Sequence, residues 1–553
     1  MRTDEENKIL SDLLFPYIKE STQDILNKFP RRDLKDTQLV LRFAPSPTGF
    51  IHIGNVYTSL VGYILTKRSD GVFILRIEDT DKVREVENGV TQIINGLKYF
   101  GIDFDEGMID ESNSRGEYGP YIQSQRESIY KVFAKDLVSK GLAYPCFCTQ
   151  EELESIRKEQ TDSGCRTGYF GKWAKWREAS FEDIKKDIEK GNKFVIRLYS
   201  KGSLENKINV KDLIKGGITL SENDMDSVLL KSDGLPTYHF AHPIDDTLMD
   251  ISYVLRGDEW LSSQPLHMEI FKVLGFKQLE YGHLSPLMKL DEGGKRKLSK
   301  RKDPEFAVSY YIEHGYPVQA VKEYLLNIAN SNFSDWRKQN LDKDILEFDL
   351  RLEKFNKAGA LFDITKLNDI SKEYISKLSA RDIYEQVLNW SERFNKGIHS
   401  KLVNHMDYCI NIFNIEREGE KIRKDIVKWS DIPYQFEIFF DDMYQSSKKN
   451  ILDIDKGLQK DILESFLNTY YYGDDAYEWF NKVKKIGEDN GFCTDYKEYE
   501  SNQKKYKGKI GDVAMVIRVA VTGRKQTPDL YQVMQVMGED RVRSRVKGYV
   551  NSI

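Results

Sequence analysis

An apolar run that leads through a glycine-containing turn into a helical pattern constrains this chain most. Leu39–Leu41 reads as a buried strand, the turn holds Pro45, Pro47 and Gly49, and apolar residues then recur at helical spacing from Val56. Where a strand passes through such a turn into a helix, unpaired backbone N–H groups and the helix dipole favour negative charge. The pattern therefore predicts a turn that binds phosphate.

The same alternation of strand and helix continues along the chain. Val72–Leu75 is a second buried run, residues 90–97 have helical periodicity, and Ile251–Leu255 is a third run. This order predicts an α/β fold, a Rossmann-type parallel sheet with its ligand at the carboxyl ends of the strands. The three runs end at Arg42, Arg76 and Arg256. One such arginine is ordinarily a solvated cap or an ion pair, but three at one edge indicate an anionic ligand.

Length and composition limit the class of protein. At 553 residues the chain should hold about three to five compact units. No apolar run approaches the roughly 18 residues of a membrane helix, and the first residues are acidic where a signal or transit peptide would be basic. Five cysteines are an odd number that suits a reducing compartment better than a disulfide framework. We therefore expect a soluble, cytoplasmic protein with no membrane partner.

Basic residues are concentrated in two segments of a chain whose net charge is −5. Lys289–Asp303, which includes GGKRKLSKRKD, holds seven basic and three acidic residues and predicts a mobile, exposed loop. Its charges are either simply solvated or close on a triphosphate as charge develops there. Ser501–Ile553 holds eleven basic and four acidic residues, a balance that suits contacts to nucleic-acid phosphates.

Two of these motifs together resemble a known family. PSPTGFIHIG, followed about 240 residues later by KLSKR (Lys297–Arg301), resembles the paired signatures of class I aminoacyl-tRNA synthetases, and RFAPSPTG resembles the glutamyl-tRNA synthetases. The resemblance implies a glutamate–tRNA ligase. Such an enzyme uses ATP and Mg²⁺ to convert L-glutamate to glutamyl-adenylate, then passes it to the 2′-hydroxyl of the terminal adenosine of tRNA(Glu). It also implies a role in protein biosynthesis.

The resemblance assigns site residues one by one. Those implied for ATP are Pro45, Ser46, Thr48, Gly49, His52, Gly54, Asn55, Lys297, Ser299 and Lys300, with His52 and Lys300 as the catalytic pair. Those implied for glutamate are Arg42, Ala44, Ser46, Glu78, Tyr238, His242 and Arg256. Arg42 and Arg256 would hold the side-chain carboxylate, because an amide there would leave buried charge unpaired. Glu78 would accept the amino group.

Some of these positions depart from the family pattern or have a plainer reading. Asn55 stands where the first signature often ends in histidine, and His242 stands where relatives often have asparagine. Taken alone, Tyr238 would be a core tyrosine with a satisfied hydroxyl, and Glu78 an ordinary acid at the end of a strand. The surrounding letters, rather than these residues themselves, favour the functional reading.

The predicted organisation alternates catalytic and inserted segments. We expect an N-terminal extension (1–37), the first half of the Rossmann catalytic domain (38–114), an inserted acceptor-binding subdomain (115–232), the second catalytic half (233–275), a stem-contact linker with the KLSKR loop (276–378) and a helical anticodon-binding region (379–553). The extension shows no chemistry and is assigned to packing at most.

The insertion holds Cys146, Cys148 and Cys165. Some family members bind zinc here, but a structural zinc site needs four ligands, and the second ligand pair is replaced by Trp173 and Trp176. We therefore expect no bound zinc, with free or buried thiols instead.

Three alternatives stay open at this stage. A glutaminyl enzyme would share the sheet but usually carries PEPNG in its first signature, and the shortened relative that modifies a queuosine base lacks the anticodon region. A catalytically silent tRNA-binding module is the third, opposed by intact His52, Gly54, Glu78 and Lys300. We expect a monomer. The sequence does not determine whether tRNA(Gln) is also charged.

Overall fold

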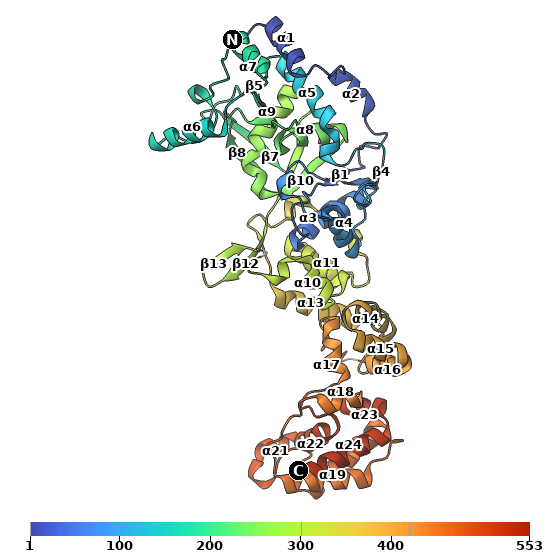
Figure 1. The fold of residues 1–553 in the computed structure, drawn as a ribbon. Helices are drawn as coiled ribbons and strands as arrows, with labels where there is room; N and C mark the ends of the chain where they lie inside the picture. The colour runs from blue at the N-terminus through green and yellow to red at the C-terminus, as the bar shows by residue number, and fades with distance from the viewer. Residues whose placement is uncertain (1, 300, 420–421) are drawn as a thin grey trace. The chain divides into compact units, whose positions relative to one another are not determined.

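The computed structural model describes residues 2–299, 301–419 and 422–553 (Figure 1). The chain divides into two compact units, one formed by Met1–Tyr310 and Lys322–Asp363, the other by Tyr311–Val321 and Ile364–Ile553. Within the described residues, no helix is long and apolar enough to cross a membrane.

The first half of the catalytic sheet follows the predicted alternation. Strands β1 (Val40–Phe43), β2 (Val72–Leu75), β3 (Glu106–Met108) and β4 (Ser114–Arg115) lie in that order, with β1, β2 and β3 parallel and β4 antiparallel. Helix α3 (Ile53–Arg68) connects β1 to β2, and α4 (Gly89–Tyr99) connects β2 to β3. Because Arg42 pairs with Ile74 in register, both strands deliver their carboxyl ends to one edge.

A second four-stranded sheet lies beside β1. Strand β10 (Tyr253–Gly257) is parallel to β11 (Glu280–Leu284), which pairs with β7 (Lys207–Asp212), and β7 pairs with β8 (Gly216–Ser221). The Ser252 amide donates to the Val40 carbonyl at 2.9 Å, so β10 lies beside β1. The third apolar run therefore ends at the same edge as the first two, and the predicted α/β class is confirmed. Hairpin β7–β8 joins this sheet although its residues fall within 115–232.

Antiparallel strands β5 (Ala143–Cys146), β6 (Val195–Leu198) and β9 (Val228–Leu230) form a separate small sheet. Its apolar side shares one core with the N-terminal extension, where Leu10 and Leu14 of α1 meet Phe133 and Leu137 of α5. The helices in this part of the chain are α1 (Asp4–Leu14), α2 (Thr22–Lys28), α5 (Glu127–Ser139), α6 (Gln150–Asp162), α7 (Phe181–Glu189), α8 (Tyr238–Leu248) and α9 (Gln264–Leu274). The extension thus contributes buried side chains to this unit.

The first part of the basic segment, which the sequence predicted as a mobile, exposed loop, forms a hairpin. β12 (Leu287–Asp291) and β13 (Gly294–Lys297) are antiparallel, and β12 also pairs with β14 (Ala360–Leu361). Arg296 makes a bidentate contact to Asp303, with Nη1–Oδ2 at 2.6 Å and Nη2–Oδ1 at 2.8 Å. The charge of Arg296 is thus paired within the protein rather than simply solvated.

The remaining helices complete the chain. Helices α10 (Val308–His314), α11 (Val318–Ala329) and α12 (Asn332–Gln339) lie before residue 340. Short 3₁₀ helices occur at Lys82–Arg84, Gln123–Arg126, Gly171–Trp173, Asp258–Ser263, Pro304–Phe306, Ile345–Glu347, Leu352–Lys354, Trp429–Asp431 and Gln503–Lys505.

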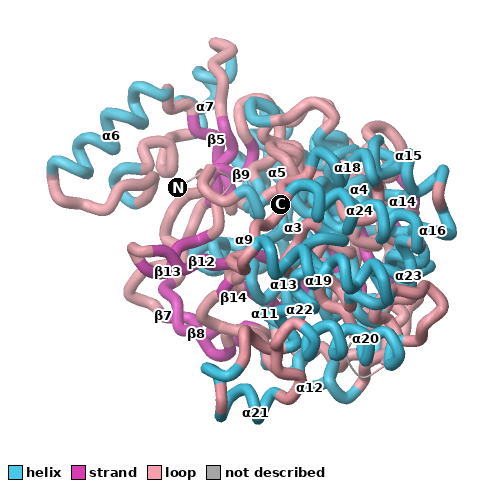
Figure 2. Tube along the Cα trace, turned by 90° about the horizontal axis from the view of Figure 1, so that it is seen from below, coloured by secondary structure: helices cyan, strands magenta, loops and turns pink. Residues whose placement is uncertain are grey.

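The second unit is helical in all its described regular elements, as Figure 2 shows for those it labels. Beyond Asp363 it contains α13 (Ile364–Lys377), α14 (Ala380–Phe394), α15 (Lys396–Asn404), α16 (Met406–Asn414), α17 (Ile432–Phe436), α18 (Asp441–Ser446), α19 (Lys456–Thr469), α20 (Ala476–Asp489), α21 (Tyr496–Ser501), α22 (Ile510–Thr522), α23 (Leu530–Met537) and α24 (Glu539–Ser552). One continuous apolar core runs through it, with Val516 and Ile517 of α22 fully buried. The predicted helical C-terminal region is confirmed.

Candidate active site

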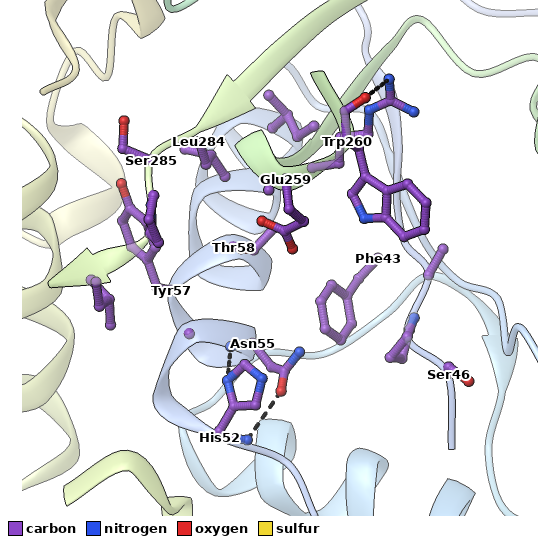
Figure 3. Close-up of a pocket in the computed structure, with 18 of the residues that line it drawn as sticks. Phe43, Ser46, His52, Asn55, Tyr57, Thr58, Glu259, Trp260, Leu284 and Ser285 are labelled. Atoms are coloured by element: carbon purple, nitrogen blue, oxygen red, sulfur yellow. Dashed lines mark hydrogen bonds between the residues drawn. The ribbon is translucent and has the colours of Figure 1, made fainter. Parts of the chain in front are cut away.

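A cavity of about 460 Å³ opens at the carboxyl edge of β1, β2 and β10, where the parallel strands end (Figure 3). Of the predicted site residues, those that line it are Arg42, Ala44, Pro45, Ser46, His52, Gly54, Asn55, Glu78, Tyr238, Arg256 and Lys297. Thr48, Gly49, His242 and Ser299 do not line it, and Lys300 lies outside the described residues. The fold thus brings residues of both distant signatures to one place.

His52 is the N-cap residue of α3. Its Nδ1 accepts the Asn55 amide at 3.2 Å, and the Asn55 side-chain oxygen accepts the His52 amide at 3.0 Å (Figure 3). Since Nδ1 acts as an acceptor, the ring proton resides on Nε2. Burial, helped by the charge of Lys297, lowers the pKa of His52 to about 4. The ring also stacks on Phe306 with 4.3 Å between centroids. The site therefore holds a neutral imidazole with a fixed Nε2–H donor.

Two of the three strand-end arginines are tied to the same carboxylate. Arg76 is fully buried and donates from Nη1 to Asp246 Oδ1 at 2.6 Å and from Nη2 to Glu78 Oε1 at 3.1 Å. Although burial disfavours its charge, the carboxylates around it raise the pKa of Arg76. Arg42 donates from Nε to both oxygens of Asp246 at 3.2 Å. Arg76 does not line the cavity and is a structural ion pair rather than a ligand-binding group.

Arg256 differs, because no described carboxylate lies within 4 Å of its guanidinium. Its Nε donates to His283 Nε2 at 3.0 Å, and Nη1 lies 3.0 Å from His267 Nδ1 and 3.4 Å from the Tyr238 hydroxyl. Nη2 donates to the Trp260 carbonyl at 3.3 Å. The residue is only 5% exposed. Isolated buried charge is costly, so a guanidinium held only by neutral acceptors is suited to an anionic ligand.

Glu78 follows β2 and faces the cavity. Burial raises its pKa to about 6 against the opposing effect of Arg76 and Arg42. The backbone amide of Glu78 donates to the Pro45 carbonyl at 3.0 Å, which holds Glu78 beside the predicted phosphate-binding turn. With a pKa of about 6, the carboxyl group of Glu78 is mostly ionised at pH 7 and can then accept hydrogen bonds from an ammonium group.

His242 lies behind the cavity wall. It is fully buried, its Nε2 lies 2.9 Å from the Tyr281 hydroxyl, and its Nδ1 lies 2.7 Å from Asp246. Its ring is parallel to that of Tyr238, 5.5 Å away. Burial lowers the pKa of His242 to about 4. The placement of His242 therefore does not support the predicted direct contact with substrate. Of these two stacked residues, Tyr238 is the one that lines the cavity.

Sequence reasoning missed several lining residues. Phe43, Tyr57, Thr58, Glu259, Trp260 and Phe306 line the cavity, and all of them but Phe306 are labelled in Figure 3. Trp260 and Glu259 follow Arg256 closely in the chain, so proximity to that arginine is the signal that could have found them. Phe306 carries no such signal, because only the fold brings it to His52.

The cysteines of the insertion do not form a four-ligand site. Cys146 Sγ and Cys148 Sγ lie 3.4 Å and 3.5 Å from the Tyr169 hydroxyl, whereas exposed Cys165 faces the Ser163 carbonyl. Among the residues that the structure describes, no group of three or more His, Cys, Asp or Glu side chains could hold a metal. The donor set thus does not fit a structural zinc ion.

Many arginines of the basic C-terminal segment are used internally. Arg524 pairs with Glu437, Arg541 and Arg545 pair with Asp441, and Arg543 pairs with Glu539. The lysines Lys504, Lys507, Lys509 and Lys525 have no carboxylate partner within the described residues and are better placed to contact an external polyanion.

Comparisons with known proteins agree with this geometry. The family model for the catalytic domain of class I tRNA synthetases (E and Q) matches residues 38–369, and an anticodon-binding domain model matches 496–550. A glutamate–tRNA ligase of Clostridium perfringens (strain SM101 / Type A) is 46% identical, with 98% of this chain and 99% of the relative covered. One from Sorangium cellulosum is 42% identical, with 95% and 96% covered.

A solved structure is similar over the same span. The crystal structure of a glutamate tRNA ligase from Elizabethkingia meningosepticum, in complex with its amino acid, aligns with a TM-score of 0.74 and 28% identity, covering 93% of this chain and 99% of that one. These matches include both the catalytic sheet and the helical C-terminal unit. As its paired signatures predicted, the chain belongs to the glutamate–tRNA ligase family of class I aminoacyl-tRNA synthetases.

Proposed function

We propose that the cavity at the strand ends is where L-glutamate is activated by ATP, before transfer to the terminal adenosine of tRNA(Glu). The single observation that carries this assignment is Arg256, a buried guanidinium with no described carboxylate partner, at the same edge as the His52 turn. A cationic pocket next to a phosphate-type turn suits an acidic amino acid beside a nucleotide.

Charge would select the glutamate side chain. Arg256 takes the side-chain carboxylate, with Arg42 beside it and Tyr238 closing the wall. Glutamine would bring an uncharged amide and leave the buried guanidinium uncompensated, which is the kind of mismatch that gives strong discrimination. Glu78 accepts the amino group once it is ionised.

Oriented hydrogen-bond donors would bind the phosphates of ATP. The Nε2–H of His52, the N-terminus of α3 and the Lys297 ammonium all carry positive potential into the cavity. The substrate carboxylate is already a nucleophile, so the protein contributes alignment and stabilises charge at the reacting phosphate. Lys300 is assigned the companion role by its signature alone.

Mg²⁺ would enter with the nucleotide. Of the carboxylates that line the cavity, Glu259 is the one near Lys297, with 3.8 Å between Oε2 and Nζ. Mg²⁺ commonly binds through one or two carboxylates together with substrate phosphates, and it neutralises phosphate charge when bound. Glu259 and the phosphates fit that pattern.

The tRNA would contact the second unit through the basic segment Ser501–Ile553, where the lysines named above have no described ion pairs.

Free cysteines, none of them in a disulfide within the described residues, are consistent with the cytoplasm, and we propose a monomer acting there.

Pyrophosphate exchange tests the assignment. Exchange of labelled pyrophosphate into ATP should require glutamate, and we expect it to appear only when tRNA(Glu) is present. Glutamine-dependent exchange, or none with either amino acid and with or without tRNA, would refute the assignment. An Arg256→Met variant should retain ATP binding and lose glutamate-dependent exchange.

A further inference from the structure

Four of the eight histidines of the chain gather around Arg256. They are His239, His242, His267 and His283, and all but His239 are fully buried. The reaction as proposed above uses none of them directly. Such a concentration of imidazoles around one guanidinium needs a physical reason.

The direction of each hydrogen bond follows from the guanidinium, which can only donate. His283 must therefore accept at Nε2, which places its proton on Nδ1, 2.6 Å from Asp212 Oδ2. His267 must accept at Nδ1, which places its proton on Nε2, 2.9 Å from His239 Nδ1. The result is a chain of donors and acceptors, His239–His267–Arg256–His283–Asp212, in which each link has one proton.

This chain works only when its histidines are neutral. A protonated His267 or His283 would turn an N–H toward the N–H groups of Arg256. Burial and the charge of Arg256 both lower the pKa of His267 and of His239, and burial also lowers that of His283. The orienting groups next to the guanidinium thus carry no charge of their own.

The other two arginines of the same sheet edge are held in the opposite way. Arg42 and Arg76 both touch Asp246 directly, so a protein carboxylate offsets their charge. The carboxylate in the hydrogen-bonded series around Arg256 is Asp212, and the whole imidazole of His283 separates it from the guanidinium. Hydrogen bonds from all three guanidinium nitrogens orient Arg256, while its charge is left for a ligand.

We propose that His267 and His283 are positioning residues that set the preference for glutamate over glutamine, because they orient Arg256 as uncharged acceptors in place of carboxylates. The proposal rests on the function assigned above to Arg256. A carboxylate in either position would also orient the guanidinium, but it would neutralise the charge that distinguishes a substrate carboxylate from an amide.

An isosteric pair of variants separates charge from shape. His267→Asn places a neutral oxygen near the position of Nδ1, and His267→Asp places a charged one there. We expect His267→Asn to keep the glutamate KM within about threefold of the wild type. His267→Asp should raise that KM by about tenfold or more, the effect of weakening one hydrogen bond to a charged group, with a smaller change in kcat. The ratio of glutamate to glutamine kcat/KM should fall in parallel.

The readout is tRNA-dependent pyrophosphate exchange with each amino acid, with thermal melting of each variant as a check on folding. The control for adding an acid is His405→Asp. His405 is exposed and directly follows α15 in the second unit, so this variant should match the wild type. If His267→Asp fails to fold, His283→Gln and His283→Glu make the same comparison at the other arm, since their side-chain ends reach the position of Nε2.

Two outcomes would count against this reasoning. Equal glutamate KM values for the Asp and Asn variants, whether unchanged or raised to the same extent, would overturn the proposal, because the charge at this position would then have no effect. A wild-type protein without glutamate-dependent exchange would refute the assigned function instead, and is distinguished from either of these because it does not depend on the variants.

Discussion

Replacing Asp246 with asparagine should destabilise the first unit strongly. Asp246 is fully buried and receives Arg42 Nε at 3.2 Å and Arg76 Nη1 at 2.6 Å, with His242 Nδ1 at 2.7 Å. Asparagine preserves the shape but removes the charge, and its amide nitrogen must face one of these nitrogens. Removing one partner of a buried ion pair costs about 3–5 kcal/mol. Since Arg76 keeps its contact to Glu78, we expect the lower end, about 3 kcal/mol.

Urea unfolding at pH 7, followed by a signal from the first unit, measures the effect as a shift in midpoint at constant m-value. Asp349→Asn is the control in the same unit, because Asp349 is exposed, and its pairs with Arg68 at 3.3 Å and with Arg351 at 2.5 Å should each contribute about 0–1 kcal/mol. A loss for Asp246→Asn no larger than that of the control would refute the reasoning that Asp246 is the shared counter-charge.

The dependence on pH gives a second check. Arg42, Arg76 and His242 hold the pKa of Asp246 well below its usual value, despite burial, which acts in the opposite direction. A lowered folded-state pKa stabilises the fold above the unfolded value of 3.8, and this contribution is lost as pH falls through the folded-state pKa. Glu78, whose pKa is about 6, loses its charge between pH 7 and pH 5 and then no longer compensates Arg76 in the variant. The difference between variant and wild type should therefore be at least as large at pH 5 as at pH 7 and shrink only below about pH 4.

Four further outcomes are expected. The glutamate KM should fall as pH rises through about 6, because ionised Glu78 binds the amino group, and Glu78→Gln should flatten this profile in steady-state exchange. Asn55→Ala should cost about 1 kcal/mol in thermal melting and reduce kcat, since it loses the bond to the His52 amide, whereas Asn55→Asp keeps the acceptor and the stability. Exhaustive treatment with a zinc chelator should leave the folded protein and its glutamate-dependent exchange unchanged, and metal analysis should find no stoichiometric zinc. Gly71→Ala should reduce soluble expression and the melting temperature sharply, because a Cβ there would lie 2.0 Å from the Leu39 carbonyl oxygen.

The sequence by itself determined the family, the α/β class and the place of the site. These follow from local patterns: apolar runs that end in arginine, a turn rich in proline and glycine, and two short signatures. Parallel strands must present their carboxyl ends together, so Arg42 and Arg256 could be assigned to one edge before any coordinates were known. Most residues implied for ATP and glutamate do line one cavity.

What each residue can do there was decided by tertiary structure. The three arginines look alike in the sequence, yet Arg76 is used in an ion pair and Arg256 is held by neutral histidines. Asp246 lies 204 residues from Arg42 and 170 from Arg76 along the chain, and no local pattern connects them. Charge, burial and hydrogen-bond direction depend on partners that only folding brings within a few ångströms, which is why the sequence located the site and the structure assigned its electrostatics.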